Sequence, residues 1–257
     1  MRTEAGEQRR RLILEHARGS GHIDVADIAG RLEVAAETIR RDLKVLEDHG
    51  LVRRTHGGAY PTDGAGFETT MTYRSGHRVP EKRRIAVAAA GKLGEAETIY
   101  LDEGFTPQLV AEELIKLQRP LTAVTASLAV AGALAPLETM SVILLGGRVR
   151  GRTLGTVDHW ATTMLSDLTI DLAILGTNGI SRDRGLTTPD PAVSAVKRKV
   201  IEVSRRRLFV GVHTKFGTNS FCKFADVSDF HTLVSDTGLS AGDARRYAAL
   251  GPEVSRV

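Results

Sequence analysis

The stretch that most constrains the fold of this chain is residues 35–59, AAETIRRDLKVLEDHGLVRRTHGGA. Ile39, Leu43 and Leu46 recur at i, i+4 and i+7, which predicts an amphipathic helix with one apolar stripe. Gly50 readily adopts a positive φ, so we expect the helix to end there. The polar side chains that lie off the stripe, and so face outward, are Thr38, Arg40, Arg41 and Lys44.

The residues that follow this helix predict a basic two-stranded wing. Residues 51–55, LVRRT, read as a short strand, and Gly57-Gly58 as a tight turn. The polar side chains that this wing presents are Arg53, Arg54 and His56.

Two shorter helices are expected before this stretch. Residues 7–18 predict a helix with Leu12, Ile13 and His16 toward one side. Asp24 is expected to cap a second helix over residues 25–32. Helix, short helix, turn, helix and basic strand pair is the order of a winged helix-turn-helix.

A helix with a basic outer face and a basic wing beside it fits a DNA major groove and its flanking phosphates. The positive charge is concentrated at Arg9–Arg11, at Arg40, Arg41 and Lys44, and on the wing. We expect the recognition helix and the wing to contact DNA through Thr38, Arg40, Arg41, Lys44, Arg53, Arg54 and His56. The alternative for any one Arg-Arg pair is an ordinary solvated surface helix.

The run ETIRRDLKVLEDHGLVRRTHGGA closely resembles the DNA-binding signature of DeoR-family bacterial transcription regulators. The signature is long, and the resemblance extends over nearly the whole chain. One departure is visible at Ala35, where the family usually has a Ser that caps the recognition helix. A missing cap costs roughly 1 kcal/mol, so we expect this helix start to fray.

Length and composition favour two globular domains in a reducing compartment. The chain has 257 residues, 42% hydrophobic and 26% charged, with a net charge of +4. Cys222 is the single cysteine, so no internal disulfide can form. The sequence contains neither a run of ~20 apolar residues nor a signal-peptide pattern, so we expect a cytoplasmic protein.

The expected domains are a winged helix-turn-helix over residues 1–60, a linker over 61–79, and a larger domain over 80–257. The linker carries Phe67-Glu68 and Arg74, which resembles a Phe-Glu…Arg pattern of the family. From residue 80 onward, short apolar strands alternate with helices. This predicts an α/β fold with a mostly parallel, Rossmann-like sheet covered on both faces.

Several expected strands end in small or polar residues, and in open α/β sheets ligands bind at the carboxyl ends of the strands. Helix N-termini at this edge offer N–H groups to anions. The alternative is that these residues only make turns and caps. From this pattern we expect a ligand to be bound by Asp102, Gly104, Phe105, Thr106, Thr125, Ser127, Gly146, Gly147, Arg148 and Asn178.

This second domain also resembles the DeoR effector domain in the runs LDEGFT, LLGGRVR, GTNGI and GLTTP, in Lys197, and in TKFG with its Lys215. The effector domain is similar to ribose-5-phosphate isomerase A and its relatives. The resemblance implies a pocket that senses a phosphorylated sugar, with Lys197 and Lys215 beside it. Asp102 would hold hydroxyl groups, and Lys215 would supply the cation. Several usually polar family positions are apolar here, among them Ala126 and Val212.

Arginines alternate at positions 148, 150 and 152 after the paired glycines. They could reach a phosphate, lie exposed, or lie at a subunit contact. The eight His residues lack the spacing of metal ligands, so we expect no metal. No Gly-x-Gly-x-x-Gly fingerprint is present, so we expect no nicotinamide and no other cofactor.

The sequence therefore predicts a DNA-binding transcription regulator, a metabolite-responsive repressor of a sugar or polyol catabolism operon. We expect it to bind operator DNA and a sugar phosphate, sugar or polyol, and to form a homo-oligomer. The first alternative is a sugar-phosphate isomerase with a DNA-binding appendage, which would need a carboxylate base. The second is an architectural DNA binder, which would respond to no metabolite.

Overall fold

The computed structural model describes residues 2–61, 68 and 70–257. The chain divides into two compact units, Met1–Tyr73 and Arg74–Val257. The division falls inside the segment expected as a linker.

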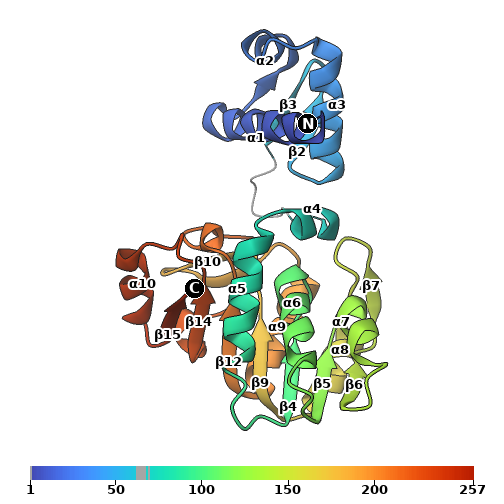
Figure 1. The fold of residues 1–257 in the computed structure, drawn as a ribbon, viewed down its shortest axis with the longest axis vertical. Helices are drawn as coiled ribbons and strands as arrows, with labels where there is room; N and C mark the ends of the chain where they lie inside the picture. The colour runs from blue at the N-terminus through green and yellow to red at the C-terminus, as the bar shows by residue number, and fades with distance from the viewer. Residues whose placement is uncertain (1, 62–67, 69) are drawn as a thin grey trace. The chain divides into compact units, whose positions relative to one another are not determined.

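The first unit is a small helical domain with a three-stranded sheet (Figure 1). The sheet has the order β1-β3-β2 and is antiparallel throughout. Buried apolar side chains from the helices and the sheet form one core, with Ile13, Ile23, Ile39 and Leu43 at most 1% exposed. In chain order its elements are α1 Arg2–Ser20, β1 Ile23–Asp24, α2 Val25–Arg31, α3 Ala36–Asp48, β2 Val52–Thr55 and β3 Gly58–Pro61.

The winged helix-turn-helix order and its local signals are confirmed. The carboxylate of Asp24 caps α2 by accepting from the backbone N–H groups of Ala26 at 2.8 Å and Asp27 at 3.0 Å. Gly50 follows α3 with φ +71°. Ala35 precedes α3 with no side-chain hydrogen bond to the helix, as its missing hydroxyl predicts.

The apolar face of the first helix was predicted partly wrongly. Leu12 is 45% exposed, whereas Ile13, Leu14 and Ala17 are buried. One residue of helix corresponds to about 100° of rotation, so adjacent leucines and isoleucines leave the buried face ambiguous in the sequence.

Two of the N-terminal arginines have a structural partner inside this domain. Nε of Arg9 lies 2.5 Å and Nη1 of Arg10 lies 3.2 Å from the carboxylate of Asp42, which is 4% exposed. The next arginine, Arg11, pairs with Glu15 one turn along α1. The basic run at residues 9–11 therefore ties α1 to α3, and much of its charge is neutralised within the domain.

The expected linker over residues 61–79 is described only in part. Residues 62–67 and 69, which include Phe67, lie outside the described residues. Residues Met71–Gly76 form a short helix, α4. The next helix, α5, follows after two residues and covers Val79–Ala90.

The second unit is built on a seven-stranded sheet in the order β15-β14-β12-β9-β4-β5-β6. Every neighbouring pair in it is parallel, so the predicted α/β class is confirmed. Its strands are β4 Thr98–Leu101, β5 Leu121–Thr125, β6 Met140–Leu144, β9 Ile170–Leu175, β12 Ser204–Val210, β14 Thr232–Ser235 and β15 Glu253–Arg256.

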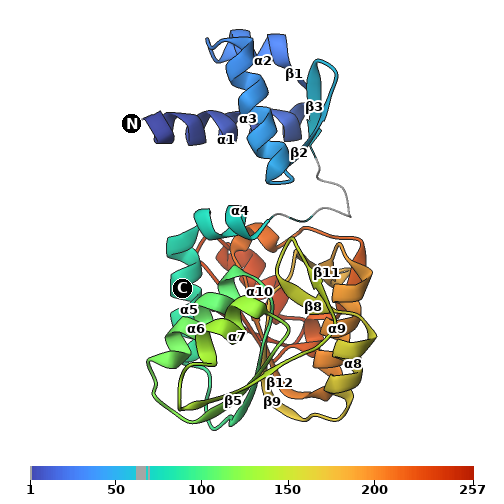
Figure 2. The ribbon, with the colours of Figure 1, turned by 90° about the vertical axis from the view of Figure 1, so that its right-hand side faces the viewer.

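Helices cover both faces of this sheet, as Figure 2 shows. Together with α5, helices α6 Phe105–Ile115 and α7 Leu128–Leu134 pack on one face. Helices α8 His159–Ser166, α9 Pro191–Val203 and α10 Ala241–Ala248 pack on the other. Successive residues of β4 point to opposite faces of the sheet. Ile99 and Leu101 belong to the core under α5, α6 and α7, and Tyr100 to the core under α8, α9 and α10.

Two small antiparallel additions sit beyond the main sheet. Strands β7 Arg148–Arg150 and β8 Gly155–Val157 form a hairpin after β6. Strands β10 Gly179–Ser181, β11 Gly185–Thr188 and β13 Cys222–Ala225 form a second small sheet. Short 3-10 turns cover His213–Lys215 (η1) and Val227–Asp229 (η2). Across the described part of the chain, no helix is long and apolar enough to span a bilayer.

The uncapped start of α3 gives a stability prediction. Ala35 has φ −61° and ψ 142°, the extended conformation of a helix N-cap. Ala35→Ser should therefore stabilise the winged helix by about 1 kcal/mol, because the hydroxyl can accept from an N–H of the first turn. Thermal unfolding of the two variants Ala35→Ser and Ala36→Ser checks this, since residue 36 already lies inside the helix. Equal stability of both variants would contradict the capping argument.

Candidate DNA-binding surface and ligand site

The outer face of α3 carries its basic side chains into solvent. Arg40, Arg41 and Lys44 are exposed, and Thr38 is half-buried, so all four lie off the buried stripe as expected. Glu37 lies 3.3 Å from Nη1 of Arg40 and 3.7 Å from Nε of Arg41. These are exposed pairs one helical turn apart, and such pairs are weak enough to be exchanged for phosphate or base contacts.

The wing is fixed to α3 by one acidic side chain. Glu47 accepts from the backbone N–H of Arg54 at 3.0 Å and pairs with Nε of Arg54 at 2.9 Å. Arg53 and His56 are exposed, and neither has an ion pair within the part of the chain that is described. Arg54 therefore positions the wing, whereas Arg53 and His56 point charge and hydrogen-bonding groups outward.

In the second unit, a buried ion pair lies at the carboxyl ends of β4 and β9. Nζ of Lys197, on α9, contacts Oδ2 of Asp102, and the two residues are 4% and 1% exposed. The backbone N–H of Gly176 donates to the same Oδ2 at 2.8 Å, and Nζ of Lys197 donates to the Gly176 carbonyl at 3.1 Å. The structure thus brings together Asp102 and Lys197, two predicted site residues that lie 95 positions apart in sequence.

A second set of charges is centred on Glu103, the residue after Asp102. The Glu103 carboxylate accepts from Oγ1 of Thr153 at 2.6 Å and lies 3.5 Å from Nη1 of Arg150. Arg150 also pairs with Asp190, the N-cap of α9, at 3.1 Å. Burial raises the pKa of Glu103, and the neighbouring Asp102 also acts to raise it, while Lys197 and Arg150 oppose the shift. We call Asp102, Glu103, Arg150, Asp190 and Lys197 the strand-end cluster.

Sequence reasoning did not assign Glu103, Arg150 and Asp190 to the site together. Of the three alternating arginines, Arg150 is the one that the β7–β8 hairpin carries to Glu103. Asp190 could have been suspected from its place before Pro191 at a helix start. Gly155 has no side chain where a Cβ would overlap the Glu103 carboxylate, so the hairpin can close over Glu103.

Two predicted ligand residues have internal roles instead. The hydroxyl of Thr125 donates to the Leu101 carbonyl at 2.6 Å and accepts from the Ser127 N–H at 3.0 Å, and Thr125 is fully buried. Ser127 is 2% exposed and caps α7, and the first N–H of that helix donates to the Leu154 carbonyl. The expected free N–H groups at the start of α7 are partly taken up within the protein, that of Leu128 by the Leu154 carbonyl and that of Val130 by the Ser127 hydroxyl.

The paired glycines lie at the turn from β6 into the hairpin, away from the buried charges. Gly147 has φ +124°, and a Cβ there would lie 2.2 Å from the Val157 carbonyl, so only glycine fits. The backbone N–H of Gly146 faces Sδ of Met164 at 3.1 Å. Arg148 is exposed, and its backbone N–H donates to Asp158. Gly146 and Gly147 thus form the turn and Arg148 begins β7, and the described contacts of these three residues include none with the strand-end cluster.

The start of α6 meets the cluster from the other side. Gly104, with φ +119°, precedes α6 and provides no side-chain cap, so the N–H groups of Phe105 and Thr106 begin the helix without one. A Cβ at Gly104 would lie 3.7 Å from Nη1 of Arg74. Half-buried Phe105 faces Nζ of Lys82, which lies 5.4 Å from the ring centroid.

Lys82 joins this helix start to α4. Nζ of Lys82 donates to the carbonyls of Arg74 at 2.5 Å and His77 at 2.6 Å. Burial lowers the pKa of Lys82 from 10.5 to about 8, and the nearby Arg74 adds to this.

The remaining predicted residues lie at the same sheet edge but farther along it. Oδ1 of Asn178 accepts from the Thr188 hydroxyl at 3.3 Å. Lys215 is half-buried in η1, which follows β12.

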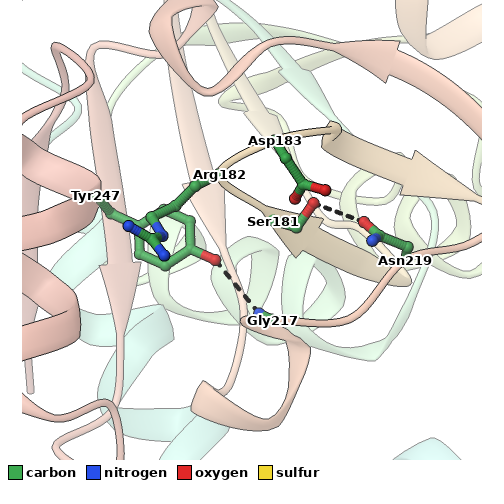
Figure 3. A pocket seen from close by; sticks show the side chains of 6 residues that line it. All are labelled: Ser181, Arg182, Asp183, Gly217, Asn219 and Tyr247. Atoms are coloured by element: carbon green, nitrogen blue, oxygen red, sulfur yellow. Dashed lines mark hydrogen bonds between the residues drawn. The ribbon is translucent and has the colours of Figure 1, made fainter.

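An open depression of about 520 Å³ lies on other loops (Figure 3). Its polar groups are bonded to one another: Ser181 donates to Asn219 at 2.6 Å, and the Tyr247 hydroxyl accepts from the Gly217 N–H at 3.3 Å. Its two charged lining residues, Arg182 and Asp183, are exposed, whereas most side chains of the strand-end cluster are buried. The lining residues are Ser181, Arg182, Asp183, Gly217, Asn219 and Tyr247.

Comparison with protein families assigns both units. Residues 9–63 match the family described as DeoR-like helix-turn-helix domain, and residues 77–237 match the DeoR C terminal sensor domain.

Similar proteins span nearly the whole chain. The HTH-type transcriptional regulator GlpR of Haloferax volcanii is 32% identical, over 96% of this chain and 96% of that protein. The glycerol-3-phosphate regulon repressor of Escherichia coli is 32% identical, over 89% and 90%. These relatives are named as regulators, which gives the isomerase alternative no support. Among solved structures, ribose 5-phosphate isomerase from Plasmodium falciparum is 19% identical over 54% of this chain and 53% of that one, with a TM-score of 0.40.

The buried Lys82 gives a pH prediction. Between about pH 8 and 10 the unfolded chain keeps this lysine protonated and the folded chain does not, so raising the pH favours the folded state. Relative to Lys82→Met, the wild-type free energy of unfolding should rise by up to about 1.4 kcal/mol per pH unit in this window. Calorimetry of both proteins across the window measures the difference. If the difference in unfolding free energy between the two proteins falls or stays constant as the pH rises, Lys82 remains charged in the folded protein.

Proposed function

Because the chain belongs to the DeoR family of transcription regulators, we propose that it is a metabolite-responsive repressor of a sugar or polyol catabolism operon. The observation that carries the proposal is the strand-end cluster, a largely buried set of charges in the sensor domain at the sheet edge where α/β proteins bind ligands. The protein would act in the cytoplasm, where operator DNA is accessible to it.

The DNA-binding surface in this proposal is the outer face of α3 together with the wing. Arg40 and Arg41 reach base edges or phosphates in the major groove, since both are exposed and, among the described residues, their ion pairs are with Glu37. Arg53 and His56 meet backbone phosphates. Arg54 acts chiefly through its pair with Glu47, which sets the angle of the wing.

The ligand in this proposal is a small polyhydroxylated compound with one anionic group. Its anionic group would lie at the start of α6, where the N–H groups of Phe105 and Thr106 and the guanidinium of Arg74 converge near Gly104. Its hydroxyl groups would meet Glu103 and Arg150. Lys197 is a poorer choice for the anion, because Asp102 already neutralises it. A relative named glycerol-3-phosphate regulon repressor fits this ligand class.

Ligand binding at this place would disturb contacts that exist without it. Glu103 is bonded to Thr153 and Arg150 of the hairpin region, so a ligand hydroxyl must compete with one of these bonds. At the other end, Phe105 contacts Lys82, which holds the end of α4. A ligand that lowers operator affinity 100-fold needs about 2.7 kcal/mol of preference for the DNA-incompetent state, which two or three such contacts can supply.

The DNA-binding surface gives the next prediction. Arg41→Ala should weaken operator binding by about 1–3 kcal/mol if Arg41 reads a base edge. Arg53→Ala should weaken binding to all sequences alike. It should also reduce the slope of log binding constant against log salt concentration by roughly one. Fluorescence anisotropy on operator and unrelated duplexes, across salt concentrations, separates the two effects. The matched control is Lys116→Ala, an exposed and ion-paired lysine of the sensor domain. Wild-type affinity and salt slope in both arginine variants would contradict the assignment.

The ligand site gives a further prediction. Asp102→Ala would leave Lys197 as a buried unpaired charge and so threaten folding, whereas Glu103→Gln keeps an acceptor for Thr153. Glu103→Gln should bind operator normally and need at least about tenfold more of a releasing sugar or polyol phosphate, the worth of one lost hydrogen bond to a charged group. Operator release measured against a panel of such phosphates tests this. The control is Glu202→Gln, an exposed glutamate of α9. A normal response in the Glu103 variant would place the ligand elsewhere.

A further inference from the structure

Half of the exposed large apolar side chains of the described residues gather at one edge of the second unit. They lie on β6, the β7–β8 hairpin, α8 and the start of α7, which are neighbours at the β6 end of the sheet (Figure 1). Backbone contacts join them, since the Leu128 N–H donates to the Leu154 carbonyl. We call this set the β6-edge patch: Leu128 36%, Leu144 37%, Val149 46%, Leu154 46%, Trp160 62% and Met164 38% exposed.

The patch surrounds an edge strand whose outer backbone groups have no partner within the described chain. Strand β6 pairs with β5 alone. The Leu145 N–H donates to the Thr125 carbonyl at 2.9 Å and the Thr139 carbonyl accepts from the Leu121 N–H at 3.0 Å, so the odd-numbered residues of this strand face β5. The N–H and C=O groups of Val142 and Leu144 therefore point away from β5, toward the open edge of the sheet. Such an edge is a template for another strand.

The opposite edge of the same sheet is protected. Strand β15 carries Glu253, paired with Lys92 at 3.0 Å, and Arg256, which donates to the Leu239 carbonyl at 2.7 Å. Charged side chains on an edge strand discourage pairing with another chain. Strand β6 has the sequence Met-Ser-Val-Ile-Leu and lacks any charge, so the two edges differ in chemistry.

From this contrast we infer that the β6-edge patch is the surface on which a second copy of this chain docks, with β6 pairing antiparallel to β6 of the partner. A strand edge that meets its own copy about a two-fold axis satisfies both rows of backbone groups with one sequence. The surrounding apolar side chains then leave water, as in the core of a subunit interface, while the exposed Glu138, Arg148 and Asp167 remain at the rim.

That the partner is a second copy of this chain rests in part on the proposed function. A repressor with one winged helix per chain gains affinity and operator symmetry when two copies bind paired half-sites. The patch also continues onto the β7–β8 hairpin that carries Arg150 to Glu103, so the surface adjoins the strand-end cluster.

The single tryptophan of the chain makes the inference directly measurable. Trp160 is 62% exposed in one copy and lies within the patch, so its fluorescence reports whether the patch is covered. In the full-length wild-type protein at micromolar concentration, we expect blue-shifted emission and weak acrylamide quenching. Dilution should shift the emission to the red as sedimentation shows loss of one association step.

A charged side chain introduced into the β6-edge patch should separate the two copies, as dilution does. Leu144→Lys should give red-shifted, readily quenched Trp160 emission at all concentrations and lose one association step by sedimentation velocity. Leu250→Lys is the matched control, because Leu250 has the same 37% exposure but lies after α10. It should behave as the wild type does. Circular dichroism of both variants verifies that the fold is retained.

Two results would overturn the inference: a monomeric wild type with solvent-exposed Trp160, or a Leu144→Lys protein that associates as the wild type does. Neither result touches the proposed function, which fails separately if the wild type binds no DNA or no metabolite alters that binding. A Trp160→Glu variant compared with Phe221→Glu, also 62% exposed, repeats the sedimentation test without relying on β6.

Discussion

The buried pair between Lys197 and Asp102 is the contact on which the sensor domain is organised. It joins α9 to the carboxyl ends of β4 and β9, and both of its partners also bond to Gly176. Removing either partner would leave an uncompensated charge in the core, which typically costs about 3–5 kcal/mol. The pair therefore fixes the loop after β4, and with it the places of Glu103, Gly104 and the start of α6.

Two neighbouring parts of the domain border the place of the proposed ligand. The β7–β8 hairpin is tied by Arg150 and Thr153 to Glu103, and it also presents Val149 and Leu154 to solvent. On the other side, Phe105 contacts Lys82, whose ammonium group holds two carbonyls at the end of α4. A ligand between Glu103 and the start of α6 would thus act on the association surface and on the segment that leads to the DNA-binding domain. A small molecule that prefers one arrangement of these two regions can shift their conformational equilibria by a few kcal/mol.

Much of this could be predicted from the sequence, because local chemistry determines it. Asp24 caps its helix, Ala35 fails to cap the next one, and the apolar runs of β4, β5 and β14 need no distant partner to be recognised. Long-range partners could not be predicted. That Arg9 and Arg10 would hold Asp42, or that Arg150 would reach Glu103, depends on packing across many residues. Thr125 and Ser127 were predicted to bind the ligand, but their hydroxyls make internal hydrogen bonds. The sequence alone does not distinguish a hydroxyl that caps a helix from one that binds a ligand.

In the proposed function, a metabolite binds between the strand-end cluster and the start of α6. Hydrogen–deuterium exchange of the full-length protein tests it directly, using whichever sugar or polyol phosphate most raises the unfolding temperature. We predict slower exchange in residues 102–108, faster exchange in the hairpin at 148–156, and a change in α4 at 71–76. This binding site would be contradicted if no compound stabilised the protein, or if protection were confined to the depression at 181–183 and 217–219.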